Sequence, residues 1–241
     1  MHSLQNACPI YGVLANYKSH YQHYVQGRDQ NFYMKYVLPQ YIDFIKPTDK
    51  IIDLGCGTGN LLKALHQKGF NNLWGVELSE MEYKIASQEN PHAHIFKNDL
   101  SSFLITTKEN FDAILLIDVL EHIKKDNILT LLELIHSKLN HKGRLILKVP
   151  NADSPIFASP SRYGDFTHEI SFNKTSLSMI LRDSNFEKIS VYPTKFIKKG
   201  TITWLVRTFV DLVIKTYMAS YMGKDALNVI LTANIIAVAE K

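Results

Sequence analysis

The stretch Ile51-Ile-Asp-Leu-Gly-Cys-Gly-Thr-Gly59 joins a short apolar run to a segment with apolar residues at three- and four-residue spacing. This pattern predicts a buried strand, a tight turn and a helix. The glycines in the turn let a ligand approach the backbone without a Cβ in the way. Their G-x-G-x-G spacing differs from the G-x-G-x-x-G of dinucleotide sites, and Asp53 stands two residues ahead of them. A carboxylate there suits a cationic, amine-bearing ligand better than a pyrophosphate, which it would repel.

Apolar runs and helical segments continue to alternate beyond this turn. Such alternation, with runs that are apolar throughout, predicts a parallel sheet covered by helices on both faces. The predicted strands are 51–54, 73–76, 94–96, 111–117, 144–149, 187–192 and 229–239, and the predicted helices are 60–68, 79–89, 126–139, 175–183 and 202–222.

Acidic side chains follow three of the predicted strands. Glu77 ends the second strand, Asp99 the third and Asp118 the fourth. Because ligands of open α/β sheets bind at the carboxyl ends of parallel strands, we expect these acids near the glycine turn. A carboxylate at Glu77 can accept both hydroxyls of a ribose, and one at Asp99 can accept from an adenine amino group. The alternative for each acid alone is a helix cap or a solvated loop residue.

As a set, these motifs resemble those of the class I S-adenosylmethionine-dependent methyltransferases, in the form of the ubiquinone-biosynthesis branch. The likeness rests on 53–59, Val76-Glu77, Asn98-Asp-Leu100 and Ile117-Asp-Val-Leu-Glu-His-Ile123. It implies an enzyme with S-adenosylmethionine as cofactor and a Rossmann-like α/β fold. The sheet would have seven strands, mostly parallel, with 229–239 as an antiparallel last strand. The residues expected to hold the cofactor are Asp53, Gly55, Cys56, Gly57, Gly59, Glu77, Leu78, Asn98, Asp99, Leu100 and Asp118, with Arg28 if the N-terminus folds over the site.

Methyl transfer from a sulfonium needs a positioned acceptor and, for a hydroxyl, a group that removes its proton. Two clusters qualify, namely Asp118-Val-Leu-Glu-His122, whose polar residues would share a face if helical, and Arg162-Tyr-Gly-Asp-Phe-Thr-His-Glu169. We predict His168 as the base, because histidine titrates near neutral pH and this one has an acid and a tyrosine beside it. Glu121, His122 and Tyr163 are the further catalytic candidates.

Each candidate also has a structural alternative. His168 would cap the following helix or pack against Phe172, and Glu121 would form a surface ion pair with Lys125. His122 would be a hydrogen-bonded structural residue.

A metal is a further alternative at the first cluster. In ubiquinone-type relatives the acid-acid-His cluster has been linked to a divalent metal, which would here use Asp118, Glu121 and His122. Two carboxylates and one histidine fit many structural roles, so we predict no metal.

The segment after the fifth strand resembles a narrower group. Tyr163-Gly-Asp-Phe-Thr-His-Glu169, followed by Phe172 and Asn185-Phe186, is similar to methyltransferases of surface-polysaccharide clusters. This resemblance implies transfer to an oxygen of a sugar, a nucleotide-linked sugar or a capsule modification such as phosphoramidate. The alternatives are O-methylation of a quinone-type or other small aromatic metabolite, and a non-catalytic S-adenosylmethionine-binding partner of another enzyme.

Composition limits the partners. The 241 residues are 46% hydrophobic and 21% charged, which argues against disorder. A net charge of +4 without an evident patch of Lys and Arg does not indicate nucleic acid, but it is compatible with an anionic or nucleotide-linked small acceptor. Cys8 and Cys56 cannot build a disulfide framework, and the chain does not open on a secretory pattern, so we expect a cytoplasmic protein.

We predict a single methyltransferase domain over residues 1–241. Residues 1–49, which are rich in tyrosine, are expected to form a helical lid over the sheet edge. The cofactor-binding core would be 50–150, the acceptor-site loop and helices 151–228, and the final strand 229–241.

The predicted helix 202–222 has one polar stripe, formed by Arg207, Asp211 and Lys215 at four-residue steps. We expect it to be buried on three sides and to cap the acceptor site. The alternatives are the interface of a homodimer and shallow contact with a membrane surface. A transmembrane span is excluded, because each of these charges costs roughly 2.5–3.5 kcal/mol at a bilayer centre.

Overall fold

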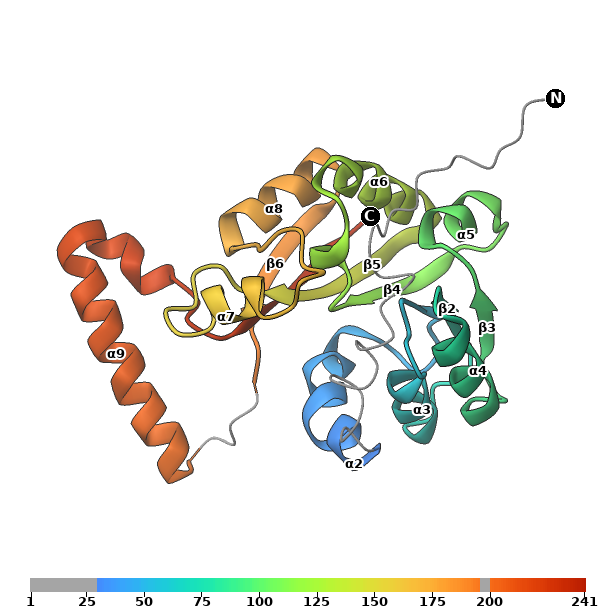
Figure 1. Ribbon diagram of the computed structural model, residues 1–241, viewed down its shortest axis with the longest axis horizontal. Coiled ribbons are helices and arrows are strands. Elements are labelled where there is room, and N and C mark those ends of the chain that lie inside the picture. Colours follow the sequence, from blue (N-terminus) through green and yellow to red (C-terminus); the bar gives the residue numbers. More distant parts are fainter. Residues whose placement is uncertain (1–29, 196–199) are drawn as a thin grey trace.

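The computed structural model describes residues 30–195 and 200–241, and its elements follow the predicted alternation (Figure 1). The strands are β1 (Ile51–Leu54), β2 (Leu73–Glu77), β3 (His94–Lys97), β4 (Phe111–Ile117), β5 (Leu139–Pro150), β6 (Glu187–Pro193) and β7 (Asn234–Glu240). The helices are α2 (Gln30–Phe32), α3 (Asn60–Gln67), α4 (Glu80–Glu89), α5 (Leu100–Thr106), α6 (Ile128–Lys138), α7 (Ala158–Tyr163), α8 (Lys174–Asp183) and α9 (Ile202–Met222). Shorter helical turns are η2 (Tyr33–Val37), η3 (Leu38–Gln40), η4 (Ile42–Phe44), η5 (Leu120–His122), η6 (Lys125–Asn127) and η7 (Gly223–Asn228).

The strands form a seven-stranded sheet in the order β3-β2-β1-β4-β5-β7-β6 within the described residues. Strands β1 to β5 pair in parallel, whereas β7 runs antiparallel to both β5 and β6. The predicted Rossmann-like α/β fold with an antiparallel last strand is therefore confirmed. The chain order reverses between β1 and β4, and the carboxyl ends of strands at such a point are where open α/β sheets bind ligands.

The last strand begins at Asn234, five residues later than predicted. The carbonyls of Ile230 and Thr232 accept hydrogen bonds from the side-chain amide of Asn151, at 2.7 and 2.8 Å. A side chain thus satisfies backbone groups that would otherwise need a partner strand.

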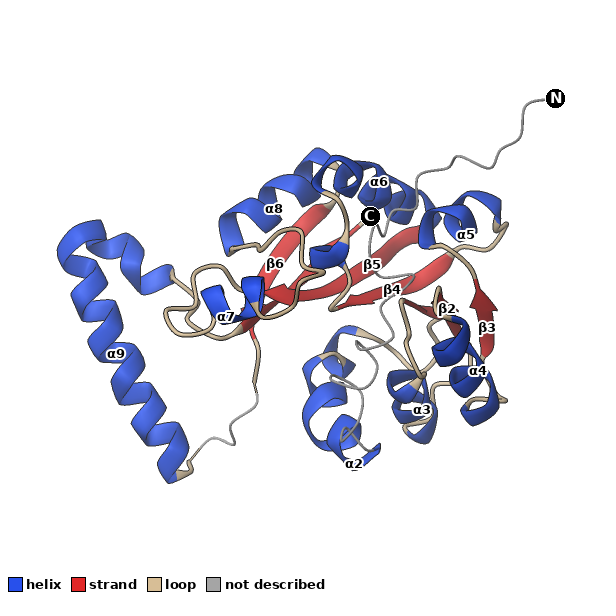
Figure 2. Cartoon of the chain, viewed as in Figure 1, coloured by secondary structure: helices blue, strands red, loops and turns tan. Residues whose placement is uncertain are grey.

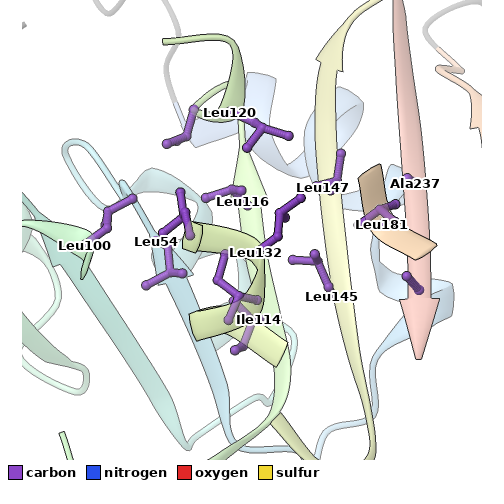
Figure 3. Close-up of a cluster of buried hydrophobic side chains, with 14 of the residues drawn as sticks. Leu54, Leu100, Ile114, Leu116, Leu120, Leu132, Leu145, Leu147, Leu181 and Ala237 are labelled. Carbon is purple, nitrogen blue, oxygen red and sulfur yellow. The ribbon is translucent and has the colours of Figure 1, made fainter. Parts of the chain in front are cut away.

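Helices cover both faces of the sheet (Figure 2). The larger apolar cluster lies under α5, α6 and α8, and Figure 3 shows Leu132 of α6 close to Ile114 of β4 and Leu145 of β5. On the opposite face, α3 and α4 cover β1 and β2. The central strands are consequently buried on both faces, as their continuous apolar runs predict.

The described part of the N-terminal segment packs on a face of the sheet, and the predicted position over the sheet edge is wrong. Leu38, Tyr41 and Ile45 are buried in the same cluster as α3 and residues of β1, β4 and β5. The physical reason is that α3 and α4 alone leave apolar side chains of the central strands uncovered on this face. Residues 1–29, including Arg28, lie outside the described residues.

Helix α9 has the predicted bounds, but the prediction that it is buried on three sides is wrong. None of its 21 residues is buried, and it lies at one end of the molecule (Figure 1). Lys215 links it to η7 by donating a hydrogen bond to the carbonyl of Leu227 at 2.8 Å. A periodic pattern locates the apolar side of a helix but does not say what covers that side. No helix among the described residues is long and apolar enough to cross a membrane.

Candidate functional site

The glycine turn after β1 has the backbone that its glycines permit. Gly55, Gly57 and Gly59 have φ values of +81°, +54° and +77°, in the left-handed region that side chains disfavour. A Cβ on Gly59 would lie 2.4 Å from Nδ2 of Asn90, and one on Gly55 would lie 2.7 Å from the side chain of Val119. A Cβ on Gly57 would meet only the Glu82 carboxylate, 4.0 Å away. Open space therefore lies over the middle of the turn, where a ligand can approach the backbone.

Glu77 holds this turn in place. One oxygen of its carboxylate accepts the N–H of Gly57 at 2.9 Å, and the other accepts the N–H of Ser79 at 2.7 Å. Burial raises the pKa of Glu77, and the hydrogen bonds from Ser79 and Gly57 oppose that rise. The predicted ribose contact of Glu77 stays a prediction.

Three acids lie around the turn, of which Asp53 and Glu77 are buried and Glu82 is half-buried. Burial and the nearby Glu77 raise the pKa of Asp53 to about 7 and likewise that of Glu82 to about 7. Sequence reasoning missed Glu82, because Ser79-Glu-Met-Glu82 reads as an ordinary helix start and Ser79 does cap the N–H of Glu82. Acids held together in this way favour a cationic ligand, which relieves both the repulsion and the loss of hydration.

The remaining predicted cofactor residues divide between the site edge and the core. Asp99 caps α5 through a hydrogen bond from Ser102 N–H to Oδ1 at 3.0 Å, so the helix-cap alternative holds for that oxygen. Asn98 Oδ1 accepts the N–H of Asp99 at 2.9 Å. Leu100 is buried in the main core, and Leu78 packs against it. Their contacts with a cofactor stay predictions.

Cys56 gives no sign of thiol chemistry. Its side chain is buried beside Gly75, whose Cβ would lie 2.9 Å from the sulfur. Burial raises the pKa of the Cys56 thiol, so the reactive thiolate is disfavoured.

Tyr41 is a buried polar residue near the turn that the sequence did not reveal. Its side chain is fully buried and its hydroxyl has no hydrogen-bond partner. Burial, together with the charges of Asp118 and Asp53, raises the pKa of Tyr41. An orphaned hydroxyl between these carboxylates marks a polar place next to the turn. No sequence signal identifies it, because Tyr41 is one of many tyrosines in that segment.

Asp118 does not join the cluster predicted for it. It has a left-handed φ of +56° and precedes the helical turn η5, so it shares no helical face with Glu121 and His122. Its carboxylate forms an ion pair with Lys148 of β5. The acid-acid-His metal set implied by the resemblance is therefore not assembled.

A different group forms around η5. One ligand-type atom each of Glu121, His122 and His168 lies within 4.8 Å of the others, a spacing that would admit a metal ion. The loop that carries His168 is held there because Glu169 N–H donates to the Glu121 carbonyl at 2.8 Å. The two imidazole rings are 4.6 Å apart and nearly perpendicular. Residues 46 positions apart in sequence thus form one site.

Hydrogen bonds fix which nitrogen carries the hydrogen in each neutral histidine ring. Nδ1 of His168 lies 2.5 Å from the carbonyl of Ser161, which can only accept, so Nδ1 carries the hydrogen. The Thr167 hydroxyl donates to Asp165 at 2.6 Å and therefore accepts from Nδ1 of His122 at 2.8 Å. In each neutral ring Nε2 is therefore the nitrogen without a hydrogen.

Asp165 links the two histidines. It accepts the hydroxyl of Thr167 behind His122, and its other oxygen lies 3.9 Å from Nε2 of His168. Burial would raise the pKa of Asp165, but the hydrogen bonds from Thr167 and the nearby histidines hold it below its ordinary value. An ionised carboxylate in this place stabilises a protonated imidazole. Sequence reasoning placed both residues in the 162–169 cluster but gave neither a role of its own.

Two structural alternatives are excluded by this geometry. His168 does not cap α8, because Asn173 and Ser176 form its capping box. Glu121 is not a surface residue paired with Lys125, because it is buried and its Oε2 has no hydrogen-bond partner. Burial, and then the charge of Asp118, raises the pKa of Glu121 well above its usual value.

Tyr163 is not part of the buried group. Its side chain is 78% exposed, and the guanidinium of Arg162 lies 5.3 Å from its ring centre. Arg162 also donates to the carbonyls of His168 and Glu169, which fixes the loop. The predicted catalytic role of Tyr163 stays a prediction.

The glycine turn and the histidine group are neighbours through Val119. The side chain of Val119 packs against Gly55, at the position where a Cβ would lie, and Val119 directly precedes η5, which carries Glu121 and His122.

Residues 21–191 match the sequence profile of the methyltransferase domain family. The chain belongs to this family. It is a methyltransferase domain, and the cofactor that its sequence motifs imply is S-adenosylmethionine.

Individual relatives support the same assignment. The methyltransferase domain is 31% identical over 96 residues to an uncharacterized methyltransferase of Alkaliphilus oremlandii, covering 40% of this chain and 43% of that protein. The chain thus spans less than half the length of this curated relative. A methyltransferase structure from Archaeoglobus fulgidus has a TM-score of 0.67 at 20% identity, covering 88% of this chain and 95% of that one. Magnesium protoporphyrin IX methyltransferase of Synechocystis PCC 6803 with bound S-adenosylhomocysteine has a TM-score of 0.55 at 17% identity, covering 85% and 80%. These two likenesses show the fold.

The residues of the methyltransferase domain fit this cofactor. The open side of Gly57 admits a ligand to the backbone, and the orphaned hydroxyl of Tyr41 offers a hydrogen bond. The cofactor has a sulfonium and an ammonium group, and Asp53, Glu77 and Glu82 supply the negative surroundings that such groups need. When bound, it supplies the methyl group as an electrophile.

Proposed function

We propose that this chain transfers the methyl group of S-adenosylmethionine to an oxygen of a small acceptor, with His168 as the general base. The observation that carries the proposal is the buried group in which Asp165 lies between His122 and His168, next to the glycine turn. The proposed domain comprises residues 1–241.

The proposed cofactor site uses the turn and the strand ends. Asp53 and Glu82 face the cationic part of the cofactor, Glu77 binds the ribose while it holds the turn, and Asp99 accepts from the adenine. Gly55, Gly57 and Gly59 admit the cofactor to the backbone. Asp118, paired with Lys148, borders the site beside Tyr41. We propose these roles because acids whose pKa is raised by burial, here Asp53, Glu77 and Glu82, are typical of functional sites, and because ligands of open α/β sheets bind at the carboxyl ends of the strands.

In the proposed reaction the acceptor oxygen attacks the methyl carbon as the carbon–sulfur bond breaks. The electron pair of that bond stays on sulfur, which leaves S-adenosylhomocysteine. The proton of the acceptor hydroxyl passes to Nε2 of His168, where Asp165 stabilises the imidazolium that forms. A hydroxyl acceptor needs this base, whereas a neutral amine does not. The arrangement of His168 and Asp165 therefore favours an oxygen acceptor.

The proposed acceptor is a sugar, a nucleotide-linked sugar or a capsule modification such as phosphoramidate. The support is the likeness of residues 163–169 to methyltransferases of surface-polysaccharide clusters, within the ubiquinone-type branch. His168, the proposed base, belongs to this same loop. The residues that carry the resemblance therefore include the residue that would carry out the chemistry.

His168→Asn tests the proposal, with His141→Asn as the matched control because His141 is exposed and remote in sequence from both clusters. Calorimetry with S-adenosylhomocysteine measures cofactor binding. Transfer of labelled methyl groups to free sugars, nucleotide-linked sugars and catechol-type phenols measures turnover. We expect His168→Asn to bind the cofactor normally and to lose turnover by about 10²- to 10⁴-fold.

Unchanged turnover in His168→Asn would refute the general-base role. Methylation confined to the phenols would replace the carbohydrate acceptor by an aromatic one. Normal binding of S-adenosylhomocysteine without transfer to any of these acceptors would favour a non-catalytic cofactor-binding partner.

A further inference from the structure

Helix α9 displays a wide apolar surface. The helix has 21 residues and is about 30 Å long. Many of its large apolar side chains have between 40% and 81% of their surface in water. A soluble monomer rarely leaves so large a continuous apolar patch in water. We call these side chains the apolar face of α9, and they are Ile202, Leu205, Val206, Phe209, Val210, Leu212, Val213, Tyr217 and Tyr221.

The charges of α9 lie on the opposite side of the helix. Arg207, Asp211 and Lys215 follow one another at four-residue steps and are only partly exposed. Arg207 and Asp211 form an ion pair at 3.7 Å, and Lys215 reaches η7. The apolar face consequently has no Asp, Glu, Lys or Arg along its whole length.

Several hydroxyl groups of α9 have hydrogen-bond partners within the helix. Thr208 donates to the carbonyl of Trp204 at 2.8 Å, Thr216 to that of Leu212 at 2.8 Å, and Ser220 to that of Tyr217 at 2.6 Å. The hydroxyls of Tyr217 and Tyr221 lie 3.4 Å apart. Transfer of this face to an apolar phase would therefore leave these donors paired, which removes most of the usual cost of burying them.

In the sequence, the net positive charge falls within the segment that contains this helix, which the overall composition does not reveal. Residues 195–225 contain six basic and two acidic side chains, a net charge of +4. The other 210 residues contain 21 of each sign and are neutral overall. Lys195 and Lys224, near the two ends of α9, are exposed. An uncharged apolar face with basic ends matches the chemistry of an anionic lipid surface.

We propose that α9 lies in the plane of an anionic phospholipid surface with its apolar face among the acyl chains. An in-plane position keeps Arg207, Asp211 and Lys215 on the water side, whereas a spanning position would carry them through the bilayer centre. A second copy of the chain is a less favourable candidate for covering the apolar face of α9. Pairing of two such helices about a two-fold axis would bring two segments of net charge +4 together. This proposal does not depend on the identity of the methyl acceptor.

Vesicle co-sedimentation of the full-length protein tests the proposal. The vesicles contain phosphatidylcholine alone or with about one-third phosphatidylglycerol. We expect at least about tenfold stronger binding to the anionic vesicles, weakened by high salt. The variant Phe209→Glu with Val213→Glu should lose this binding. Its matched control is Ile105→Glu with Leu129→Glu, which makes the same charge change at exposed apolar residues of α5 and α6 and should bind as the wild type does.

A second variant and two further measurements keep the result interpretable. Lys195→Glu with Lys224→Glu changes only exposed charges and should weaken binding to anionic vesicles selectively. Binding of S-adenosylhomocysteine should be unchanged in every variant, which shows that each one is folded. Light scattering gives the oligomeric state. The proposal is overturned if the wild type ignores anionic vesicles or if the α9 variant binds them equally well. A stable wild-type dimer that Phe209→Glu with Val213→Glu dissociates, without vesicle binding by either, would assign the face to a second copy.

Discussion

The carboxyl edge of the sheet, where the cofactor site is proposed, and helix α9 differ in which side chains are in contact with water. The edge buries acidic side chains, and α9 exposes apolar ones. At the edge, Asp53, Glu77 and Glu121 are acids with less than a tenth of their surface in water, and burial raises the pKa of each. In α9, large apolar side chains such as Phe209 are mostly in water. Both arrangements are costly for the isolated chain. Binding relieves each of them, through a cationic ligand in the first case and an apolar phase in the second. Buried acids in the first region and exposed apolar side chains in the second therefore both indicate a binding function.

Glu77→Ala should have the largest effect on the cofactor side. Its carboxylate accepts from both Gly57 and Ser79, so its loss frees two backbone donors and loosens the turn. Each hydrogen bond to a charged group contributes roughly 1.5–3 kcal/mol, and we expect the affinity for S-adenosylhomocysteine to fall by about 100-fold or more. Calorimetry measures it. Glu80→Ala is the control, because Glu80 is an exposed partner of Lys84 and Lys97. Equal affinities in the two variants would show that Glu77 does not hold the site.

The two regions also differ in how much the sequence could predict. Around the turn, a glycine at a left-handed φ, a strand end and a following helix are all local in sequence, so the sequence alone locates 53–59 and Glu77. The seven strands and the antiparallel last strand followed from the family resemblance and agree with the structure, whereas the order of the strands was not predicted.

Long-range contacts explain what the sequence did not provide. Tyr41 reaches Asp53 and Asp118 only through packing of the N-terminal turns on the sheet face. Thr167 connects Asp165 to His122 across 45 residues, and no periodic pattern records such a contact. The surroundings of α9 were also unpredictable, because its amphipathic pattern is compatible with a protein core, a second chain or a lipid surface.

Gly59→Ala should produce the next largest effect, on stability. Its left-handed φ costs an alanine roughly 1–2 kcal/mol, and the new Cβ would meet Nδ2 of Asn90, which is itself hydrogen-bonded to the carbonyl of Ala86. We expect the free energy of unfolding to fall by about 2–4 kcal/mol in urea titrations. Gly69→Ala is the matched control, with φ +89° and nothing within 4 Å of the new Cβ, and should cost only about 1 kcal/mol. If both variants lose the same stability, close packing at the turn contributes nothing.

Cofactor affinity should depend on pH through Asp53. With a pKa raised to about 7 in the free protein, this carboxyl is largely protonated at pH 6 and largely ionised at pH 8. The cationic group of the ligand binds the ionised form, so affinity rises with pH. Between pH 6 and 8 we expect S-adenosylhomocysteine to bind about tenfold more tightly, with release of a proton. Calorimetry in buffers of different ionisation enthalpy measures both quantities. Asp53→Asn should flatten the profile, and an unchanged slope in this variant would assign the titration to another group such as Glu82.

Removal of metal ions should have the smallest effect, and it separates two interpretations of the same side chains. Glu121, His122 and His168 are close enough to hold an ion, yet proton transfer through Nε2 of His168 and Asp165 needs none. We therefore expect full turnover after treatment with a chelator and gel filtration. A loss of turnover that Mg²⁺, Mn²⁺ or Zn²⁺ restores would contradict this expectation. Direct binding of the ion to the wild type but not to His168→Asn would then show that the histidine acts as a ligand, because a general base would not change metal affinity.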